Sequence, residues 1–157
     1  NDNMLIMYGD VLFRSYILND LLESDGDMVV VIDSMLETTT ISGAPDYTFC
    51  TKKDDCSLIK QEVFIKHISE QRKNELGEPD GRWIGMMKVN QIGRQWLHEA
   101  IEHLKAGDDF DSLSMPDLLN FLVKQGRKIH VHYINGHWLD VNSLDDIARA
   151  SDFTHGQ

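Results

Sequence analysis

Two uninterrupted runs of apolar residues are the strongest features of the first part of the chain. Residues 4–8 (Met-Leu-Ile-Met-Tyr) and residues 28–32 (Met-Val-Val-Val-Ile) are apolar at every position, which is typical of central strands covered on both faces. Between them, residues 16–22 place apolar side chains at helical spacing, and the polar segment 24–26 ends that pattern. The order strand, helix, strand predicts a right-handed parallel crossover in an α/β fold.

The middle of the chain, residues 35–81, has a different character. A turn-forming stretch and a strongly polar stretch at 70–81 accompany two short candidate strands, at 47–51 and 63–68. Runs of this length between turn residues predict short strands. We therefore expect an excursion of strands and loops inside a single domain that spans residues 1–157.

Three elements in the second half have clear boundaries. Residues 82–89 form another buried type of strand, and Asn90 is suited to cap a following helix whose apolar positions fall on one side. Ser114 and Asp117 form a variant of the capping box, with Asp in place of the usual Glu. This variant predicts the start of a second amphipathic helix, which ends near Gly126.

The last part of the chain carries a strong hairpin signal. Residues 128–134 alternate between apolar and polar positions, the pair Asn135-Gly136 favours a tight turn, and residues 137–141 resemble a returning strand. This pattern predicts two antiparallel strands joined by that turn. A final helix is predicted over residues 143–150.

Composition narrows the classes of function. The 157 residues include 26 acidic and 15 basic side chains, and the formal charge of −11 argues against binding along a nucleic-acid backbone, which requires clustered Lys and Arg. The longest apolar runs are far shorter than the roughly 20 residues of a membrane helix. Cys50 and Cys56 form neither a Cys-x-x-Cys motif nor a disulfide framework. We therefore expect a reduced, cytoplasmic protein without a nucleic-acid or membrane partner.

A carboxylate at the end of a buried strand is the best candidate for chemistry. Asp10 follows the run at 4–8 through Gly9, and ligands of open α/β sheets bind beyond the carboxyl ends of strands. Gly9 allows a sharp turn or the close approach of a ligand, and an acidic oxygen there suits Mg²⁺ with nucleotide phosphates. The pair Gly-Asp also forms ordinary turns and helix caps. Asp140, at a later strand end, is a second candidate ligand, and the sequence leaves open whether the two converge.

Three basic residues and two histidines are further candidates. Arg14, Arg82 and Lys88 lie near strand ends, where they could neutralise an anionic ligand, although each is equally explained as a solvated charge. His130 and His132 alternate along one strand, a spacing that can hold zinc, but no third ligand has a fixed spacing from them. The sequence contains no Gly-x-Gly-x-x-Gly and no Walker motif. A phosphate-binding loop, if the protein has one, is therefore expected outside this segment.

Six motifs, spread in order over nearly the whole chain, match one family. They are Tyr8-Gly-Asp-Val-Leu-Phe-Arg-Ser-Tyr-Ile-Leu, Gly26-Asp-Met-Val-Val-Val-Ile-Asp-Ser, Gly81-Arg-Trp-Ile-Gly, Met115-Pro-Asp-Leu-Leu-Asn, Gly136-His-Trp-Leu-Asp-Val-Asn-Ser-Leu-Asp-Asp and Ser151-Asp-Phe-Thr-His-Gly. Together they resemble the nucleotidyltransferase region at the C-terminal end of bifunctional phosphoenolpyruvate mutases of phosphonate biosynthesis. The chain resembles more distantly the sugar-phosphate nucleotidyltransferases and the cytidylyltransferase that acts on 2-aminoethylphosphonate.

The resemblance implies a fold, a reaction and a set of site residues. The implied fold is a Rossmann-like α/β domain with a mixed, mostly parallel sheet flanked by helices. In the implied Mg²⁺-dependent reaction, an oxygen of a phosphonate such as 2-aminoethylphosphonate attacks the α-phosphorus of CTP, and pyrophosphate leaves. Asp10 matches the metal-binding Asp of the family, and Asp140 lies where a late metal-binding Asp of related transferases is found. Trp83 and Gly85 match the strand that borders the acceptor pocket.

The resemblance also implies that part of the domain lies outside this chain. The glycine-rich loop of the family, with its basic residues for the triphosphate, would precede Asn1. We therefore expect the C-terminal part of one nucleotidyltransferase domain, completed by an N-terminal half on the same polypeptide or on another chain, and inactive alone. The alternative is a non-catalytic binding or regulatory domain that keeps the fold. The oligomeric state stays open, a homo-oligomer included.

Overall fold

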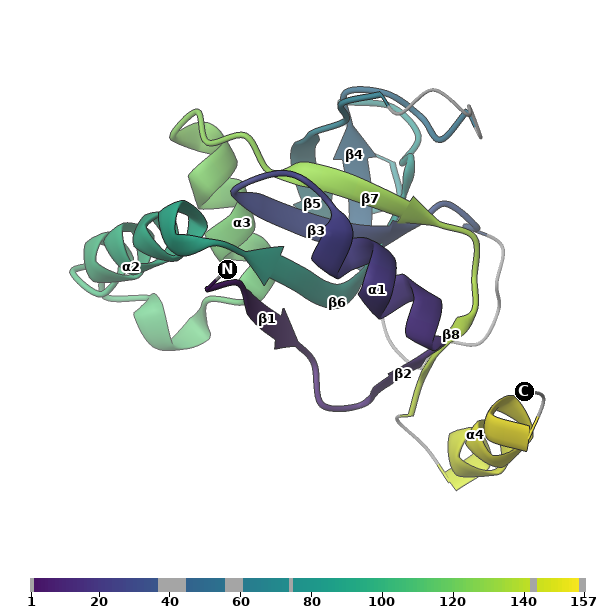
Figure 1. The fold of residues 1–157 in the computed structure, drawn as a ribbon. Coiled ribbons are helices and arrows are strands. Elements are labelled where there is room, and N and C mark those ends of the chain that lie inside the picture. The colour runs from purple at the N-terminus through teal and green to yellow at the C-terminus, as the bar shows by residue number, and fades with distance from the viewer. Residues whose placement is uncertain (1, 37–44, 56–60, 74, 142–143, 156–157) are drawn as a thin grey trace.

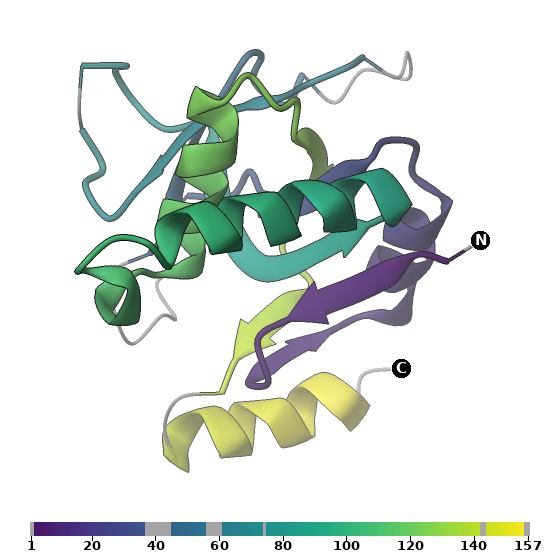
Figure 2. The ribbon, with the colours of Figure 1, turned by 90° about the vertical axis from the view of Figure 1, so that its left-hand side faces the viewer.

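A six-stranded sheet with helices on both faces forms the body of the protein (Figures 1 and 2). The computed structural model describes residues 2–36, 45–55, 61–73, 75–141 and 144–155. The strand order is β5 (Ile65–Ser69), β4 (Tyr47–Cys50), β6 (Gly81–Val89), β3 (Met28–Asp33) and β7 (His130–Ile134), and β1 (Met4–Met7) also pairs with β6. The expected α/β architecture with a mixed sheet is therefore confirmed.

The expectation of a mostly parallel sheet is wrong. Among the described strands of this sheet only the β3–β7 ladder is parallel, whereas β1–β6, β3–β6, β4–β5 and β4–β6 are antiparallel. Since β1 and β3 both run antiparallel to β6, they are parallel to each other, as the crossover pattern predicts, but β6 lies between them. An uninterrupted apolar run indicates that a strand is covered on both faces, and it does not determine the direction of the neighbouring strand.

β1 lies at an edge of the sheet in the described part of the chain. It pairs with β6 on one side, and Met4 and Met7 at its two ends are each 37% exposed. The expectation of a central strand over residues 4–8 is therefore not met among the described strands, where β1 lies at an edge. Its apolar sequence is nevertheless typical of a strand with neighbours on both sides.

The two strands expected within residues 35–81 are β4 and β5, which belong to the central sheet because β4 pairs with β6. Cys50 ends β4 as a buried free thiol, and Cys56 lies outside the described residues. The segment that looks like an excursion in the sequence therefore supplies one side of the sheet.

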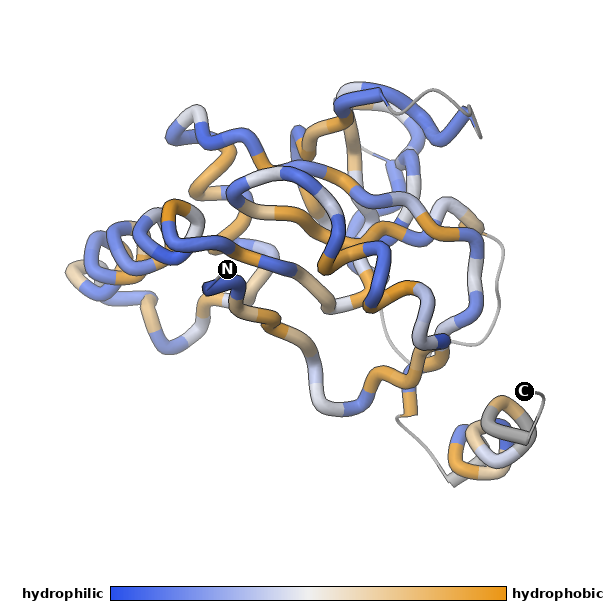
Figure 3. Tube along the Cα trace, in the orientation of Figure 1, coloured by the Kyte–Doolittle hydropathy of each residue, from blue (hydrophilic) through white to orange (hydrophobic). Residues whose placement is uncertain are grey.

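Helices cover both faces of the sheet. α2 (Gln91–Leu104) and α3 (Met115–Lys124) lie on one face, and α1 (Ser15–Glu23) lies on the other (Figure 2). Because side chains alternate along a strand, Val30 of β3 packs in the core under α2 and α3 while Val29 packs in the core under α1. Each such fully buried side chain contributes roughly 1.5–3 kcal/mol. Hydrophobic residues accordingly follow the strands of the sheet (Figure 3).

The helix starts predicted from capping residues are confirmed. Asn90 Oδ1 accepts a hydrogen bond from the backbone N–H of Gly93 at 3.0 Å. At the start of α3, Ser114 Oγ accepts from the Asp117 backbone N–H at 3.3 Å, and the Asp117 carboxylate accepts from the Ser114 N–H at 2.8 Å. Gly126, two residues after α3, has the positive φ of 80° that favours glycine.

The hairpin predicted over residues 128–141 does not form. β7 joins the main sheet in parallel beside β3, while β8 (Trp138–Asp140) leaves it and pairs with β2 (Val11–Phe13) as a separate two-stranded sheet. The turn has positive φ at both Gly136 and His137, and the Gly136 N–H donates to Asp33 Oδ1 at 3.0 Å. A tight-turn signal is local, so it could not reveal that β3 and β2 offer the two strands better partners.

The last helix, α4 (Leu144–His155), stands apart from the main sheet beyond β2 and β8 (Figure 1). It is longer than the predicted helix over 143–150, whose first residue lies outside the described residues. The Arg14 guanidinium lies 4.5 Å from the ring centroid of Phe153 and connects α4 to the start of α1. A short 3-10 helix, η1 (Phe110–Ser112), connects α2 to α3.

Candidate active site

One edge of β6 is shared by two strands that leave a gap between them. β4 pairs with Gly81 and Arg82, and β1 pairs with residues 86–89. Within the gap, the Tyr8 N–H donates to the Gly85 carbonyl and the Trp83 N–H donates to the Asp46 carbonyl, both at 2.9 Å. The carboxyl end of β1 therefore meets the start of β4 at the middle of β6, the kind of strand junction where ligands of α/β folds bind.

Tyr8 is the exposed aromatic residue of this gap, and Trp83 lies beneath it. Trp83 is 5% exposed and donates its indole N–H to the Met86 carbonyl at 3.1 Å, whereas Tyr8 is 39% exposed. The two ring centroids are 5.3 Å apart. Gly85 has a φ of 77°, and a Cβ there would collide with the Tyr8 ring. Gly85 and Trp83 thus support Tyr8, which is the side chain that a ligand could reach.

The backbones of the two candidate metal ligands lie side by side. Across the β2–β8 ladder Val11 is opposite Asp140, and the Val141 N–H donates to the Asp10 carbonyl at 2.8 Å. Burial, and then the charge of Asp10, raise the pKa of Asp140 to about 6 against the opposing effect of Arg82. The pairing of β2 with β8 makes the Asp10 and Asp140 backbones neighbours, and their binding of one metal ion stays a prediction.

The donor set at this position suits a hard divalent cation. Mg²⁺ in nucleotide sites is held by one or two carboxylates together with substrate phosphates and water, and Asp10 with Asp140 supplies two carboxylates. Burial first and the charge of Asp10 second raise the pKa of Asp140, and a bound cation would favour its ionised form. Among the residues that the structure describes, no three His, Cys, Asp or Glu side chains gather closely enough to hold a metal by themselves. The pair therefore fits a metal ion that is also bound by a phosphate ligand.

An acidic cavity of about 450 Å³ opens beside Tyr8. It lies between the end of β5 and the first turn of α3, and its acidic lining residues are Asp46, Glu70 and Asp117. Burial, then the charges of Glu70 and Asp140, raise the pKa of Asp46 to about 6. The charge of Asp140 thus acts on this cavity through Asp46, and the acidic lining favours a cationic group.

Tyr8 and Asp46 line the candidate site; the sequence placed Tyr8 in a candidate motif without giving it a role, and it did not select Asp46. Tyr8 belongs to the Tyr-Gly-Asp motif, but the pattern predicts it as the last residue of a buried strand. Asp46 follows Pro45, where the pattern predicts an ordinary turn. Burial, then the charges of Asp46 and Asp10, raise the pKa of Tyr8 to about 12. The phenol of Tyr8 therefore remains a hydrogen-bond donor at neutral pH.

Two of the basic candidates are buried and fully occupied with the protein itself. Arg82 is 5% exposed and pairs with Asp33 at 3.1 Å. Lys88 is 3% exposed and lies near the C-terminal end of β6. Its ammonium donates to the carbonyl of Leu22 in the last turn of α1 and to that of Ser24, which follows the helix. A cation there complements the C-terminal end of a helix. The structure therefore does not bring Lys88 together with the carboxylate pair.

The remaining candidates have mixed positions. Arg14 precedes α1, and its guanidinium lies over Phe153 of α4. Gly9 occupies the turn between β1 and β2, and a Cβ added there would meet no atom within 4 Å. Position 9 thus has open space around it inside this chain, which is compatible with the approach of a ligand. His130 Nδ1 is buried without a hydrogen-bond partner, and His130 and His132 have no third metal ligand in the described part of the chain.

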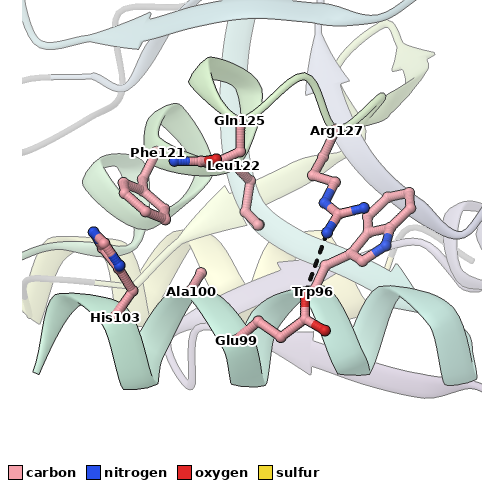
Figure 4. A pocket seen from close by; sticks show the side chains of 8 residues that line it. All are labelled: Trp96, Glu99, Ala100, His103, Phe121, Leu122, Gln125 and Arg127. Atoms are coloured by element: carbon pink, nitrogen blue, oxygen red, sulfur yellow. Dashed lines mark hydrogen bonds and ion pairs between the residues drawn. The ribbon is translucent and has the colours of Figure 1, made fainter.

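A smaller cavity of about 220 Å³ lies between α2 and α3 (Figure 4). The ring of His103 stacks on Phe121 with centroids 5.2 Å apart, and Arg127 lies over Trp96 while pairing with Glu99 at 3.2 Å. These side chains interact with one another across the helix–helix groove, and no residue expected to bind a ligand lines it. We assign this cavity to helix packing.

The fold is shared with solved nucleotidyltransferases. The inositol-1-phosphate CTP transferase from T. maritima matches with a TM-score of 0.66 and 12% identity, over 99% of this chain and 56% of that chain. A putative glucose-1-phosphate thymidylyltransferase from Bacillus anthracis matches with a TM-score of 0.63 and 16% identity, over 100% and 56% of the two chains. The CTP:phosphocholine cytidylyltransferase from Streptococcus pneumoniae matches with a TM-score of 0.59 and 13% identity, over 96% and 57%.

These matches establish the fold, and the chain spans a little over half the length of each matched protein, 56–57%. At 12–16% identity the likeness carries no residue roles. No family model matches the chain, and no curated protein has a significantly similar sequence. None of the described helices combines the length and apolar character needed to cross a membrane.

Proposed function

We propose that this chain contributes the metal-binding and acceptor side of a Mg²⁺-dependent nucleotidyltransferase site, which transfers the cytidylyl group of CTP to a phosphonate such as 2-aminoethylphosphonate. The observation that carries this proposal is the meeting of Asp10 and Asp140 beside the gap in β6, on a fold shared with solved nucleotidyltransferases. In the proposed reaction a phosphonate oxygen forms a bond to the α-phosphorus of CTP, and the bond to pyrophosphate breaks.

The carboxylate pair is the proposed metal site. Asp10 and Asp140 would hold Mg²⁺ together with phosphate oxygens of the nucleotide, and the ion would neutralise the charge that develops on those oxygens. Gly9, which has open space around it, would let the nucleotide approach the backbone beside Asp10. The pKa of Asp140 is raised by burial and by Asp10, so the ionised pair is most favourable when a cation is present.

The acidic cavity is the proposed site for the acceptor. An ammonium group suits a cavity lined by Asp46, Glu70 and Asp117, because opposite charges attract most strongly where water is partly excluded. Tyr8 lies between this cavity and Asp10, and its protonated phenol can donate to a phosphonate oxygen. An aminoalkyl phosphonate would therefore place its cationic end in the cavity and its anionic end near the metal.

Residues outside this chain are needed to complete the proposed site. A triphosphate requires a loop of backbone N–H groups and basic side chains, and Arg82 and Lys88 are both buried in interactions with the protein. We propose that an N-terminal half, in the same polypeptide or in another chain, supplies that loop. The proposal is supported by the exposed ends of β1, by its single pairing among the described strands, and by the greater length of the matched structures. A fusion to a phosphoenolpyruvate mutase is the context that the sequence motifs favour.

Metal titration tests the carboxylate pair directly. With CTP present as the phosphate ligand, we expect the chain to bind Mn²⁺, used as a paramagnetic substitute for Mg²⁺, and we expect Asp10→Asn and Asp140→Asn each to weaken that binding by about tenfold or more. Asp108→Asn, on the exposed turn after α2, changes the net charge equally and should leave the affinity unchanged. Equal Mn²⁺ affinity in all four proteins would refute the proposed metal site.

Turnover tests the claim that the site is incomplete. With CTP and 2-aminoethylphosphonate, the isolated 157 residues should release no detectable pyrophosphate, and the same residues joined to an upstream nucleotide-binding half should release it. Robust release by the isolated chain would contradict the division of the site. A joined protein that binds CTP and Mg²⁺ without any turnover would instead support the non-catalytic alternative.

A further inference from the structure

Asp33 is a buried hydrogen-bond centre at the end of β3. It is 0% exposed, and its Oδ1 accepts from the backbone N–H groups of Met35 and Gly136, both at 3.0 Å. Its Oδ2 accepts from the indole N–H of Trp138 at 2.8 Å and from Arg82 Nη2 at 3.1 Å. A fully buried carboxylate is tolerated only when its charge is compensated and its oxygens are hydrogen-bonded, and both conditions are met.

The partners of Asp33 belong to two separate sheets. Among the described strands, no ladder joins the main sheet to the β2–β8 sheet, so side chains and turns hold the two in place relative to each other. Gly136 and Trp138 flank the start of β8, and both donate to Asp33. Because side chains two residues apart on a strand project to the same side, Trp138 and Asp140 face the same way. The position of Asp140 is therefore tied to the bonds that Trp138 makes.

Arg82 completes the attachment of Trp138. Its guanidinium carbon lies 4.7 Å from the indole ring centroid, so the indole has a cation over its face and the Asp33 carboxylate at its N–H edge. Since Arg82 is 5% exposed and already paired with Asp33, its charge is used within the protein.

We propose that Asp33 and Arg82 are positioning residues of the candidate site: through Trp138 and the Gly136 turn they fix β8 so that Asp140 lies beside Asp10. This inference rests on the proposed function, because the two residues matter for activity only if Asp10 and Asp140 bind the metal. It assigns no contact with the nucleotide or the acceptor to either residue. It replaces the sequence expectation that Arg82 binds substrate with a role inside the protein.

The decisive variant combines Asp33→Asn with Arg82→Met. Removing both charges together avoids leaving one buried ion unpaired. The first measurement is amide hydrogen exchange at Val141, whose N–H donates to the Asp10 carbonyl, compared with Val30 in the main sheet. Loss of hydrogen bonds to a charged acceptor corresponds to about tenfold or more in the local opening equilibrium, so we expect Val141 to exchange about tenfold faster relative to Val30.

The second measurement is Mn²⁺ affinity, which should fall by about the same factor because the ligands are no longer held together. Leu119→Ala is the matched control, since Leu119 is fully buried under the other face of the sheet. It should destabilise the whole domain while leaving the Val141 to Val30 exchange ratio and the Mn²⁺ affinity unchanged. If the double variant merely reproduces the behaviour of Leu119→Ala, Asp33 and Arg82 are ordinary structural residues and the inference is overturned.

A milder variant covers the case in which the double variant does not fold. Trp138→Phe removes only the indole donor to Asp33 and keeps an aromatic ring beside Arg82, so relative exchange at Val141 should rise by about threefold. An exchange ratio equal to that of the wild type would overturn the inference. Hydrogen exchange needs no metal, so it tests this inference separately from the proposed function. If the wild-type chain does not bind Mn²⁺, the proposed metal site is refuted. Exchange at Val141 still decides whether Asp33 positions β8.

Discussion

The ring of Tyr8 occupies the space that any side chain at position 85 would need. Gly85 has a φ of 77°, and a Cβ built on it would collide with Cδ2 of Tyr8. The Tyr8 N–H also donates to the Gly85 carbonyl at 2.9 Å. The exposed aromatic residue of the candidate site is therefore held by a glycine that lies within a buried strand.

Gly85→Ala should consequently destabilise the domain and displace Tyr8. A non-glycine residue at positive φ costs about 1–3 kcal/mol, and the collision adds to that cost. Gly9→Ala is the control, because a Cβ there meets nothing within 4 Å, and its unfolding free energy should stay within about 0.5 kcal/mol of the wild type. Urea denaturation measures both. A Gly85→Ala protein as stable as Gly9→Ala would contradict the packing of Tyr8 on Gly85.

Lys88→Met should reduce stability without affecting nucleotide or metal binding. The Lys88 ammonium donates to carbonyls at the end of α1, and losing hydrogen bonds to a charged group costs about 1.5–3 kcal/mol, partly offset by the burial of the Met side chain. Lys105→Met removes an exposed lysine that pairs with Glu102, so it should change stability by less than about 1 kcal/mol. Thermal unfolding with and without Mn²⁺ distinguishes the two. Loss of Mn²⁺ binding in a folded Lys88→Met protein would show that Lys88 contributes to the metal site.

The raised pKa values of Asp46 and Asp140, both about 6, predict a specific pH dependence of stability. Each carboxyl holds its proton more tightly when folded than in the unfolded chain, so its stabilising contribution is fully present below about pH 4 and is lost as the pH rises through about 6. Asn resembles the protonated form. Asp46→Asn and Asp140→Asn should therefore become more stable relative to the wild type as the pH rises from 4.5 to 7.5.

Urea denaturation across this pH range, performed without divalent cations, measures the difference. Asp108→Asn serves as the control for net charge, because Asp108 lies exposed on the turn after α2. A stability difference between Asp46→Asn and the wild type that does not grow with pH would show that burial and the neighbouring carboxylates do not raise the pKa of Asp46.

Selectivity for a cationic acceptor should depend on Asp46. Under the proposed function, 2-aminoethylphosphonate binds better than ethylphosphonate, which lacks the ammonium group, because Asp46, Glu70 and Asp117 line the cavity. Removing one partner of such a charge contact in a partly buried site costs about 1–3 kcal/mol, or roughly five- to a hundredfold in affinity. Asp46→Asn should therefore weaken 2-aminoethylphosphonate and leave ethylphosphonate unchanged in calorimetric titrations. An equal loss of affinity for both ligands would show that the ammonium group of 2-aminoethylphosphonate does not bind at Asp46.

The elements that the sequence predicted well are those whose signals are local. Asn90 and Ser114 start their helices because a side-chain oxygen within three residues satisfies a backbone N–H, and this geometry is complete within one turn. The strands β3 and β6 were predictable because every one of their residues is buried. In each case the physical cause lies within the segment itself.

The errors come from competition between distant segments. The Asn135-Gly136 signal predicts a hairpin, yet β7 and β8 each find a better partner, and Asp33 holds the turn between them in another geometry. Arg82 and Lys88 look like charges available to a ligand until tertiary packing buries both. Hydrogen-bond partners of buried charges are chosen by the whole fold, and no local pattern reveals them.

For this protein the sequence by itself determined that a carboxylate, Asp10, follows an apolar strand, and its motifs pointed to a family of nucleotidyltransferases. Only the tertiary structure decided that the Asp140 backbone lies next to that of Asp10, that the Tyr8 ring packs on Gly85, and that Asp46 and Tyr8 line one cavity. The physical reason is the distance along the chain over which each interaction acts. Side-chain period and capping act over a few residues, whereas the convergence of carboxylates depends on which strand edges remain free once the core has formed.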